Sequence, residues 1–275
     1  MDQQQRQWEL NRVNFAGRWC GSSQWYLRGD QLNLSQPSRV IDDTCYDIHF
    51  SDPDNGIWDG RGLLFAPEGR RQLTLNRDSY NSGGQCWQFL GAGGQSSLRV
   101  DAAAERFGHE VNLFAGRSRS MLVLLWGQHP TAEGVIWSLD AVGAVGFRCS
   151  NASTQEPPRP IQPPEQLLRS IEGWQGTRET WLDGQIEPCE AFSAEQFAVH
   201  PLTATFVDGL ICSVPEHLPQ CTSGCRSAVA PAPRPSNKSA WSSTTNNRSS
   251  CVNVVAIGRR PSKAMANFRA MTPHR

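Results

Sequence analysis

Several cysteine and histidine residues in this chain of 275 residues have spacings that could bind a metal. His217, Cys221 and Cys225 follow one another at intervals of four residues, and Cys251 lies further on. The set superficially resembles a zinc site, because thiolates and imidazoles are common zinc ligands. Its intervals are looser than those of structural zinc motifs, and chance pairs of these residue types are common. The sequence therefore predicts no metal site.

Two other arrangements could carry out covalent or phosphate chemistry. Cys20 or Cys149 could act with His49 or His109 as nucleophile and base, but nothing in the sequence places them together. Buried thiols and surface histidines are the simpler interpretation. The glycine-rich segment 91–94 lacks the lysine, the Ser/Thr and the helix that a phosphate-binding loop requires. The sequence thus predicts no catalytic residue.

The bulk composition excludes several classes of protein. The 26 basic and 26 acidic residues balance, so the chain lacks the positive surface typical of nucleic-acid-binding proteins. No apolar run approaches the roughly 20 residues of a membrane-spanning helix. Residues 1–7 are polar and unlike a secretory signal, which predicts a cytoplasmic protein. In that compartment the nine cysteines are expected to be reduced thiols.

A short sequence motif, called the phrase below, occurs twice and indicates how the chain divides into domains. Residues 17–29 and 172–184 align from Trp19 and Trp174. Both copies read Trp-x-Gly, then Ser or Thr, then Gln or Glu two positions on, then an aromatic residue followed by Leu-x-Gly. A match at this many positions predicts two copies of one structural unit.

The elements around each copy predict mostly strands. Short helices are expected at 8–16 and 164–171, directly before the two phrases. Between turn signals, short apolar or alternating runs predict an antiparallel all-β sandwich or barrel in the first half. The predicted strands there include 45–50, 62–66, 72–76, 86–90, 97–102, 109–115, 121–126, 134–140 and 146–149.

The chain divides into four predicted segments. Residues 1–150 form the first barrel, 151–164 a proline-rich linker, and 165–219 the start of a second domain. Residues 220–275 contain one Trp, one Phe and no Tyr, and only 251–257 has a strand pattern. This tail is either a disordered extension or the frame-shifted end of a damaged coding sequence. We favour the second interpretation, because the repeat predicts further strands that are missing here.

The two phrases also carry a resemblance to known proteins. A Gly-x-Trp on the first strand after a short helix resembles the lipocalin (calycin) barrel signature, and the chain over residues 8–218 is similar to the mainly cyanobacterial domain-of-unknown-function 3598 family. That resemblance implies tandem lipocalin-like antiparallel barrels, the second incomplete. It also implies a barrel base in which an arginine from the last strand stacks on Trp19, and Arg148 is the matching candidate. The signature positions are Gly17, Trp19, Gly21, Arg148, Gly173, Trp174 and Gly176.

A barrel of about eight strands is just wide enough for one small ligand. Trp25, Tyr46, His109 and Trp126 are the expected wall residues of the first barrel, and Arg178 is an inward-facing charge in the second. An arginine there could pair with a carboxylate. A closed, solidly packed core is the alternative.

The function expected from these features is non-catalytic binding of an apolar or amphipathic small molecule. The resemblance implies a linear tetrapyrrole such as a bilin, a carotenoid or a fatty acid, with a pigment protein as a further partner. An enzyme like the bilin lyases, which attach chromophores, is the first alternative and rests on fold analogy. A protein-interaction module without a ligand is the second. No cofactor follows from the residues themselves.

Overall fold

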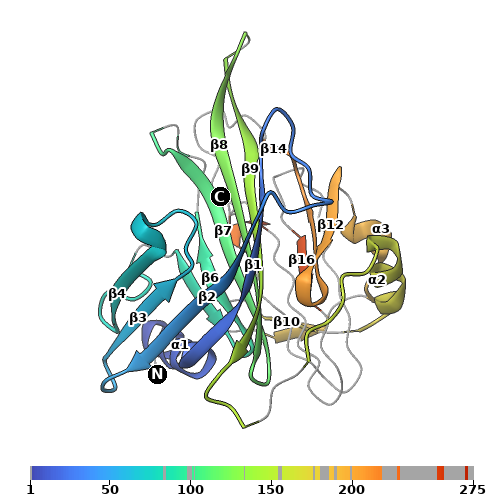
Figure 1. Cartoon of the computed structure of the whole chain (residues 1–275). Coiled ribbons are helices and arrows are strands. Elements are labelled where there is room, and N and C mark those ends of the chain that lie inside the picture. The colour runs from blue at the N-terminus through green and yellow to red at the C-terminus, as the bar shows by residue number, and fades with distance from the viewer. Residues whose placement is uncertain are drawn as a thin grey trace.

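The structure is a computed structural model that describes residues 2–82, 85–97, 101, 103–132, 134–153, 157–175, 177–179, 186–188, 191–198, 200–218, 228–229, 253–256 and 270–271. Its main feature is a curled antiparallel sheet that forms a half-barrel (Figure 1). A smaller layer of short helices and strands packs on the outer surface of that sheet. The all-β expectation is confirmed.

The main sheet has ten antiparallel strands: β1 (Gly17–Leu27), β2 (Arg39–Phe50), β3 (Asn55–Arg61), β4 (Arg70–Asn76), β5 (Cys86–Phe89), β6 (Ala92–Ser96), β7 (Arg106–Ala115), β8 (Ser118–Thr131), β9 (Gly134–Cys149) and β14 (His217–Leu218). Their order is β4-β3-β2-β1-β9-β8-β7-β6-β5, with β14 beside β9. Strands β1 and β9 are neighbours, so the first and last strands of the predicted first domain join its two halves. Within the described residues β4 and β5 do not pair, so the sheet stays open there.

Three predictions of strands in this sheet differ from the structure. Of the predicted strand 97–102, the described residues 97 and 101 are not in a strand, because β6 ends at Ser96. Residues 62–66 form bends and turns, because Gly62 has a φ of 68° and ends β3. The runs 134–140 and 146–149 belong to one continuous strand, β9, which pairs with β8 along most of its length. The residues between the two runs belong to the same strand and lie in the middle of the sheet.

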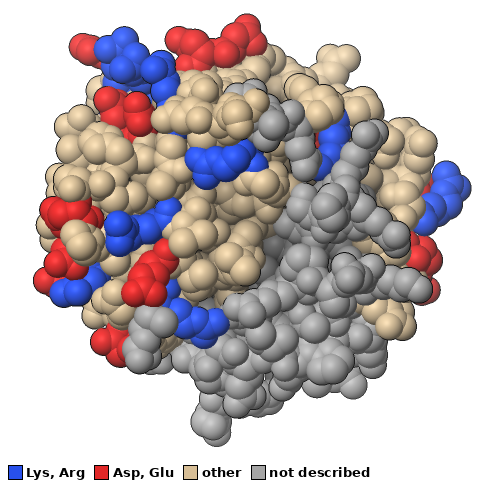
Figure 2. Space-filling model, turned by 90° about the horizontal axis from the view of Figure 1, so that it is seen from below, with Lys and Arg blue, Asp and Glu red and all other residues tan. Residues whose placement is uncertain are grey.

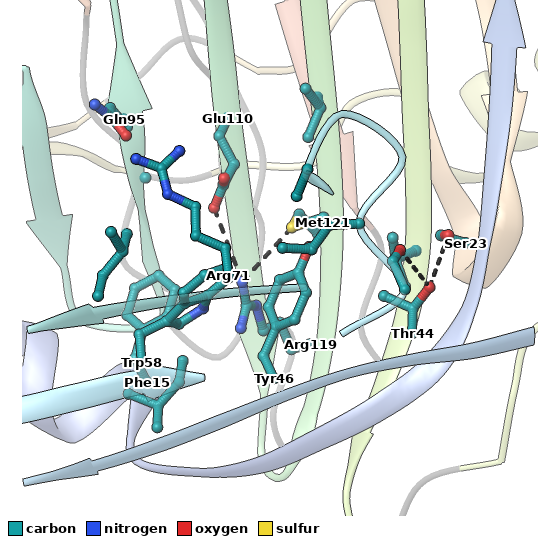
Figure 3. Close-up of a pocket in the computed structure, with 18 of the residues that line it drawn as sticks. Phe15, Ser23, Thr44, Tyr46, Trp58, Arg71, Gln95, Glu110, Arg119 and Met121 are labelled. Atoms are coloured by element: carbon teal, nitrogen blue, oxygen red, sulfur yellow. Dashed lines mark hydrogen bonds and ion pairs between the residues drawn. The ribbon is translucent and has the colours of Figure 1, made fainter. Parts of the chain in front are cut away.

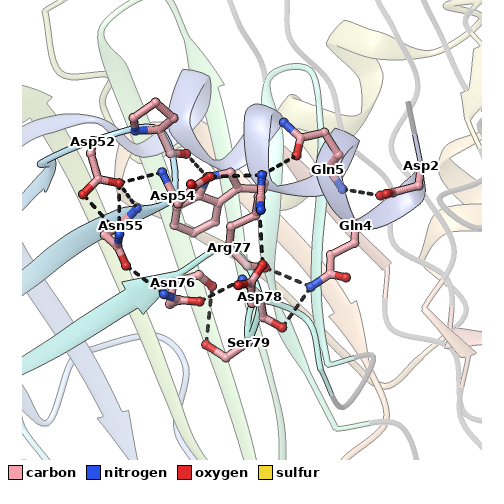
Figure 4. Close-up of polar contacts among 12 residues, drawn as sticks. Asp2, Gln4, Gln5, Asp52, Asp54, Asn55, Asn76, Arg77, Asp78 and Ser79 are labelled. Carbon is pink, nitrogen blue, oxygen red and sulfur yellow. Dashed lines mark hydrogen bonds and ion pairs between the residues drawn. The ribbon is translucent and has the colours of Figure 1, made fainter.

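Helix α1 (Gln3–Phe15) begins five residues earlier than the predicted start at 8. Asp2 caps it, because its carboxylate accepts the backbone N–H of Gln5 at 2.8 Å. The first turn then reaches the end of β4: Gln4 Nε2 donates to the carbonyls of Arg77 and Asp78 at 2.9 and 3.0 Å (Figure 4). A polar N-terminus is therefore part of the fold.

Further along α1, buried amides bind the opposite edge of the sheet. Gln7 donates to the carbonyl of Gln88 at 2.9 Å and accepts its N–H at 2.6 Å, so it completes the unpaired edge of β5. Trp8, fully buried, donates from Nε1 to the carbonyl of Pro53 beyond β2. The helix thus bridges both ends of the open sheet, and it does so with amides rather than with an apolar stripe.

Alternate side chains of the sheet form two separate cores. The concave face holds a cluster that includes Phe15, Trp19, Tyr46, Met121 and Phe147. The convex face holds a larger cluster: Tyr26, Trp87, Phe107, Leu122, Leu124, Trp126 and Leu139, among others. An apolar convex face would be unstable in water, so a second layer has to cover it.

That layer comes from the second half of the chain. The described elements of this half are α2 (Pro164–Ile171), β10 (Thr177–Glu179), β11 (Ile186–Pro188), α3 (Ala194–Phe197), β12 (Leu202–Phe206), the 3₁₀ turn Val207–Gly209, β13 (Leu210–Val214), β15 (Ala228–Val229), β16 (Asn253–Ala256) and β17 (Ala270–Met271). Phe206, Leu210 and Cys212 are buried in the same cluster as Trp126. Strands β12, β13 and β16 form one sheet, which confirms a strand within 251–257. The duplication of a whole barrel stays a prediction.

A buried ion pair fastens the covering layer to the convex face. Asp208, in the turn before β13, accepts from Arg148 Nη2 at 2.6 Å and Nη1 at 2.9 Å, and from Ser120 Oγ at 3.0 Å. Burial alone would raise the pKa of Asp208, but the hydrogen bonds and charge of Arg148 outweigh it and lower that pKa. Asp208 is therefore ionised at neutral pH, and its pairing with Arg148 joins the layer to the sheet.

The expectation that all cysteines are reduced is wrong for one pair. Cys20 on β1 and Cys45 on β2 face each other directly in the sheet, with Cα atoms 4.2 Å apart, and form a disulfide. The two positions are 25 residues apart in the sequence, and only the strand register brings them together.

Candidate functional site

A cavity of about 390 Å³ lies on the concave side of the half-barrel (Figure 3). Residues of β1 to β9 and of the loop at 62–66 surround it. Most of its lining is apolar or aromatic, and Trp25, Trp58, Ile48, Leu73 and Val145 are examples. The volume falls within the range of about 300–1,000 Å³ found for small-molecule sites.

Strand alternation decides which side chains reach the cavity. Every second residue of a strand points to the same face, so Ser23 and Trp25 of β1 line the cavity while Tyr26 lies in the convex cluster. In β8, Arg119, Met121 and Val123 line it in the same way. The residues between them face the covering layer.

Arg119 is the charged residue at the closed end of the cavity. Its side chain is 1% exposed, and its Nε donates to Asn112 Oδ1 at 2.7 Å. Asn112 in turn donates to Glu110 Oε1 at 2.8 Å, whereas Glu110 itself is 3.9 Å from Arg119 Nη2 (Figure 3). Nη2 also points to the sulfur of Met121 at 3.6 Å. Nη1 has no hydrogen-bond partner among the described residues.

Four aromatic rings surround this guanidinium. Its central carbon is 4.8 Å from the ring centroid of Phe15, 4.9 Å from Phe147, 5.3 Å from Tyr46 and 5.9 Å from Phe114. Burial lowers the pKa of Arg119 to about 10, with the charge of Glu110 acting in the opposite direction. The side chain therefore stays cationic at neutral pH, and the ring faces stabilise it there.

Tyr46 contributes a neutral hydroxyl beside Arg119. Burial raises its pKa far above the usual value, with a further contribution from Glu110, while Arg119 acts to lower it. No hydrogen bond of this hydroxyl is seen within the described part of the chain. Tyr46 is thus available as a donor to a group in the cavity.

The open end of the cavity lies under the loop at 62–66. Phe65 is 49% exposed, contacts Trp25 edge to face at 5.1 Å, and has Arg106 stacked 4.7 Å from its ring centroid. Arg71 of β4, an exposed residue, lines the same cavity and points toward Gln95 (Figure 3). No ion pair of Arg71 is seen among the described residues.

The structure brings together two of the five predicted ligand-binding residues. Trp25 and Tyr46 line the cavity. His109 and Trp126 lie on the convex face, in contact with each other and with Phe107. For these two residues the predicted placement in the barrel interior is wrong.

Arg178, the fifth residue, belongs to β10, and its side chain lies outside the described residues. The predicted tail after 219 also falls mostly outside them. Of the second signature, Gly176 is not described, Gly173 has a φ of 73°, and Trp174 packs against the buried cluster of α2 and α3.

In the first signature, the tryptophan is buried against an arginine, but this arginine is not the predicted one. Trp19 is fully buried and is covered by Arg117, whose central guanidinium carbon lies 4.6 Å from the ring centroid. Arg148 cannot reach this ring, because it is paired with Cys20 in the register and shares its convex side. The predicted stack of Arg148 on Trp19 is therefore wrong.

Gly17 and Gly21 are glycines for steric reasons. Gly17 has a φ of 130° at the start of β1. A β-carbon on Gly21 would lie 2.5 Å from the carbonyl oxygen of Gly146 on the neighbouring strand. The register of β1 against β2 also shifts between Gly21 and Ser23, so the strand bends there as expected for a barrel base.

No family model matches the chain, and no curated protein does. The resemblance described above therefore stays a prediction, and the site has to be interpreted from its own geometry.

The face of the molecule shown in Figure 2 has no patch of a single charge among the described residues. On the face shown in Figure 2, the basic and acidic side chains of the described residues are intermixed. None of the described helices is long and apolar enough to cross a membrane. Cys149 lies in the concave cluster and His109 in the convex one, so these two cannot act as nucleophile and base together.

Proposed function

We propose that the half-barrel binds an apolar or amphipathic small molecule in its concave cavity. The observation that carries this proposal is a cavity of about 390 Å³ with apolar walls and one buried cation at its closed end. Binding sites for small ligands combine an apolar lining with a few fixed polar groups in this way.

The resemblance adds candidates for the ligand: a linear tetrapyrrole, a carotenoid or a fatty acid. A cytoplasmic location is a separate part of the same proposal. The disulfide between Cys20 and Cys45 weighs against it, because such bonds are rare in the reducing cytosol.

The first experiment is a titration of the full chain with Nile red, a neutral dye whose emission rises in apolar surroundings. The full chain is needed because residues 202–218 complete the convex core. We expect saturable enhancement of emission. A dye without charge reports on the cavity independently of Arg119.

A pair of matched variants locates the dye. Val123 lines the cavity, so Val123→Trp should fill it and remove the enhancement. Val40 is 47% exposed on β2 and does not line the cavity, so Val40→Trp should bind the dye as the natural chain does. Thermal melts of both variants check that they fold. Absence of saturable binding by the natural chain, or equal binding by Val123→Trp, would overturn the proposal and favour the interaction module.

A further inference from the structure

We propose that Arg119 anchors the carboxylate of a ligand with a single negative charge, bound with its head at the closed end of the cavity. This inference rests on the proposed function and specifies the ligand class. It selects a fatty-acid-like monocarboxylate over an uncharged carotenoid.

The donors of Arg119 outnumber the acceptors around it. A guanidinium has five N–H groups. Nε is satisfied by Asn112, and Nη2 has only a thioether at 3.6 Å and a carboxylate oxygen at 3.9 Å, which is beyond hydrogen-bond distance. Nη1 has nothing among the described residues. Buried unsatisfied donors are rare in folded proteins and call for a specific explanation.

Cation–π contacts do not remove this deficit. The central carbon of the guanidinium lies over the four rings, which stabilise its charge, but a ring face is a weak acceptor for N–H groups. A carboxylate in the cavity would supply strong acceptors for that edge, since arginine and carboxylate match in shape and charge. The hydroxyl of Tyr46, which also lacks a partner among the described residues, could donate to the same group.

The charges that line the cavity favour one negative charge on the ligand. Its charged lining residues are Arg71, Arg119 and Glu110, which leaves one positive charge in excess. A monocarboxylate would balance that charge. A phosphate or a dicarboxylate would bring a second negative charge close to Glu110, at an electrostatic cost that rises in a poorly hydrated site.

The walls then accommodate an apolar chain. Met121, Val123, Leu73 and Phe65 are among the apolar residues that line the cavity with Arg119. A ligand with its head at Arg119 would place its chain along these residues and its tail under Phe65. The geometry therefore fits an amphiphile that enters head first.

The test compares palmitate, hexadecanol and hexadecylamine, which share one chain length and differ only in the head group. Binding to the full chain is measured directly by calorimetry and again by displacement of Nile red. We expect palmitate to bind roughly tenfold or more tightly than hexadecanol, the scale of one buried charge-assisted hydrogen bond, and the amine to bind least tightly.

Two matched variants assign the effect. Arg119→Met keeps an apolar side chain of similar length and should reduce palmitate binding to the level of hexadecanol, with Nile red still bound. Arg71→Met removes the cation at the open end and should keep the preference for palmitate. If Arg71→Met removes that preference and Arg119→Met does not, the anchor has been assigned to the wrong arginine.

A measurement on the natural chain covers the case in which Arg119→Met does not fold. Palmitate labelled with ¹³C at its carboxyl carbon should stay ionised in the complex at a lower pH than in detergent micelles, because a guanidinium favours the charged form. Equal affinity for palmitate and hexadecanol, or an unshifted titration, would refute the carboxylate anchor. If Nile red still binds saturably in the same experiment, small-molecule binding in the cavity remains supported. If neither palmitate nor Nile red binds, the proposed function itself is refuted.

Discussion

The buried histidine on the convex face predicts a specific dependence of stability on pH. His109 is 5% exposed, its Nε2 has no partner among the described residues, and its ring lies 5.1 Å from Phe107 and 6.0 Å from Trp126. Burial lowers its pKa from 6.5 to about 4. The folded protein therefore holds this histidine neutral, whereas the unfolded chain protonates it below about pH 6.5.

The sign and size of this dependence of stability on pH follow from proton linkage. Between pH 4 and 6.5 the unfolded chain binds more protons at this position than the folded chain does, so stability falls as the pH falls through this window. The difference between the two pKa values corresponds to about 3 kcal/mol when the pH is below both. At pH 5 we expect a loss of about 2 kcal/mol relative to pH 7.5.

The assay is urea unfolding of the full chain at pH 7.5 and pH 5.0, followed by circular dichroism. His109→Leu should be close to neutral at pH 7.5, because the ring nitrogen has no partner to lose, and should abolish most of the loss at pH 5.0. His49→Leu, at an exposed position of β2, is the matched control and should keep the full dependence. Asp208 does not interfere, because its lowered pKa keeps it ionised throughout this range.

Two results would refute this reasoning. One is a natural chain that is equally stable at both pH values, because a neutral buried imidazole requires a loss at pH 5.0. The other is a His109→Leu variant with the same dependence as the natural chain, which would assign the protonation to another group.

Three further predictions concern the contacts that hold the fold together. Asp208→Asn should lower the free energy of unfolding by about 3 kcal/mol at pH 7, because it removes the negative charge 2.6 Å from Arg148 Nη2 in a largely buried pair. Urea unfolding of Asp208→Asn, of Arg148→Met and of the double variant would measure the coupling between the two side chains. Arg117→Met should cost about 0.5–2 kcal/mol in thermal melts by uncovering Trp19, and an unchanged melting temperature would contradict a stabilising stack. Cys45→Ser should cost about 3 kcal/mol in non-reducing urea unfolding by opening a loop closed across 25 residues, and no effect would mean that the thiols are reduced in solution.

Strand alternation explains which parts of the site could be predicted from the sequence. Trp19 and Trp25 were placed correctly on the concave face, because the Gly-x-Trp phrase indicates which alternate side chains of β1 point into the barrel. His109 and Trp126 were placed on the wrong face. In a lone barrel the apolar side of a strand faces inward, but here the covering layer makes the outer side apolar as well, and the sequence of β7 alone does not show it.

Arg119 was missed for the same reason. The segment 117–120 alternates arginine and serine, and such a polar run is typical of residues in contact with water. Only the register of β8 against β7, which sets Arg119 opposite Phe114, places the guanidinium inside the barrel. A weak signal was present. Met121 and Val123 lie two and four positions after Arg119, so their side chains share its face of the strand, and they lead directly into an apolar run.

The two faces of the sheet differ in how completely their charges are satisfied, and that difference is the strongest argument for where ligands bind. On the convex face, the charge of Asp208 is paired twice by Arg148, and His109 is kept neutral, so its unpartnered Nε2 leaves no unpaired buried charge. On the concave face, Arg119 is equally well buried but has an unsatisfied nitrogen next to a cavity. Selection for stability alone would favour an apolar residue at that position, since replacing buried ionic groups by apolar ones is often stabilising. A cation retained there at a cost in stability is what a site for an anionic head group requires.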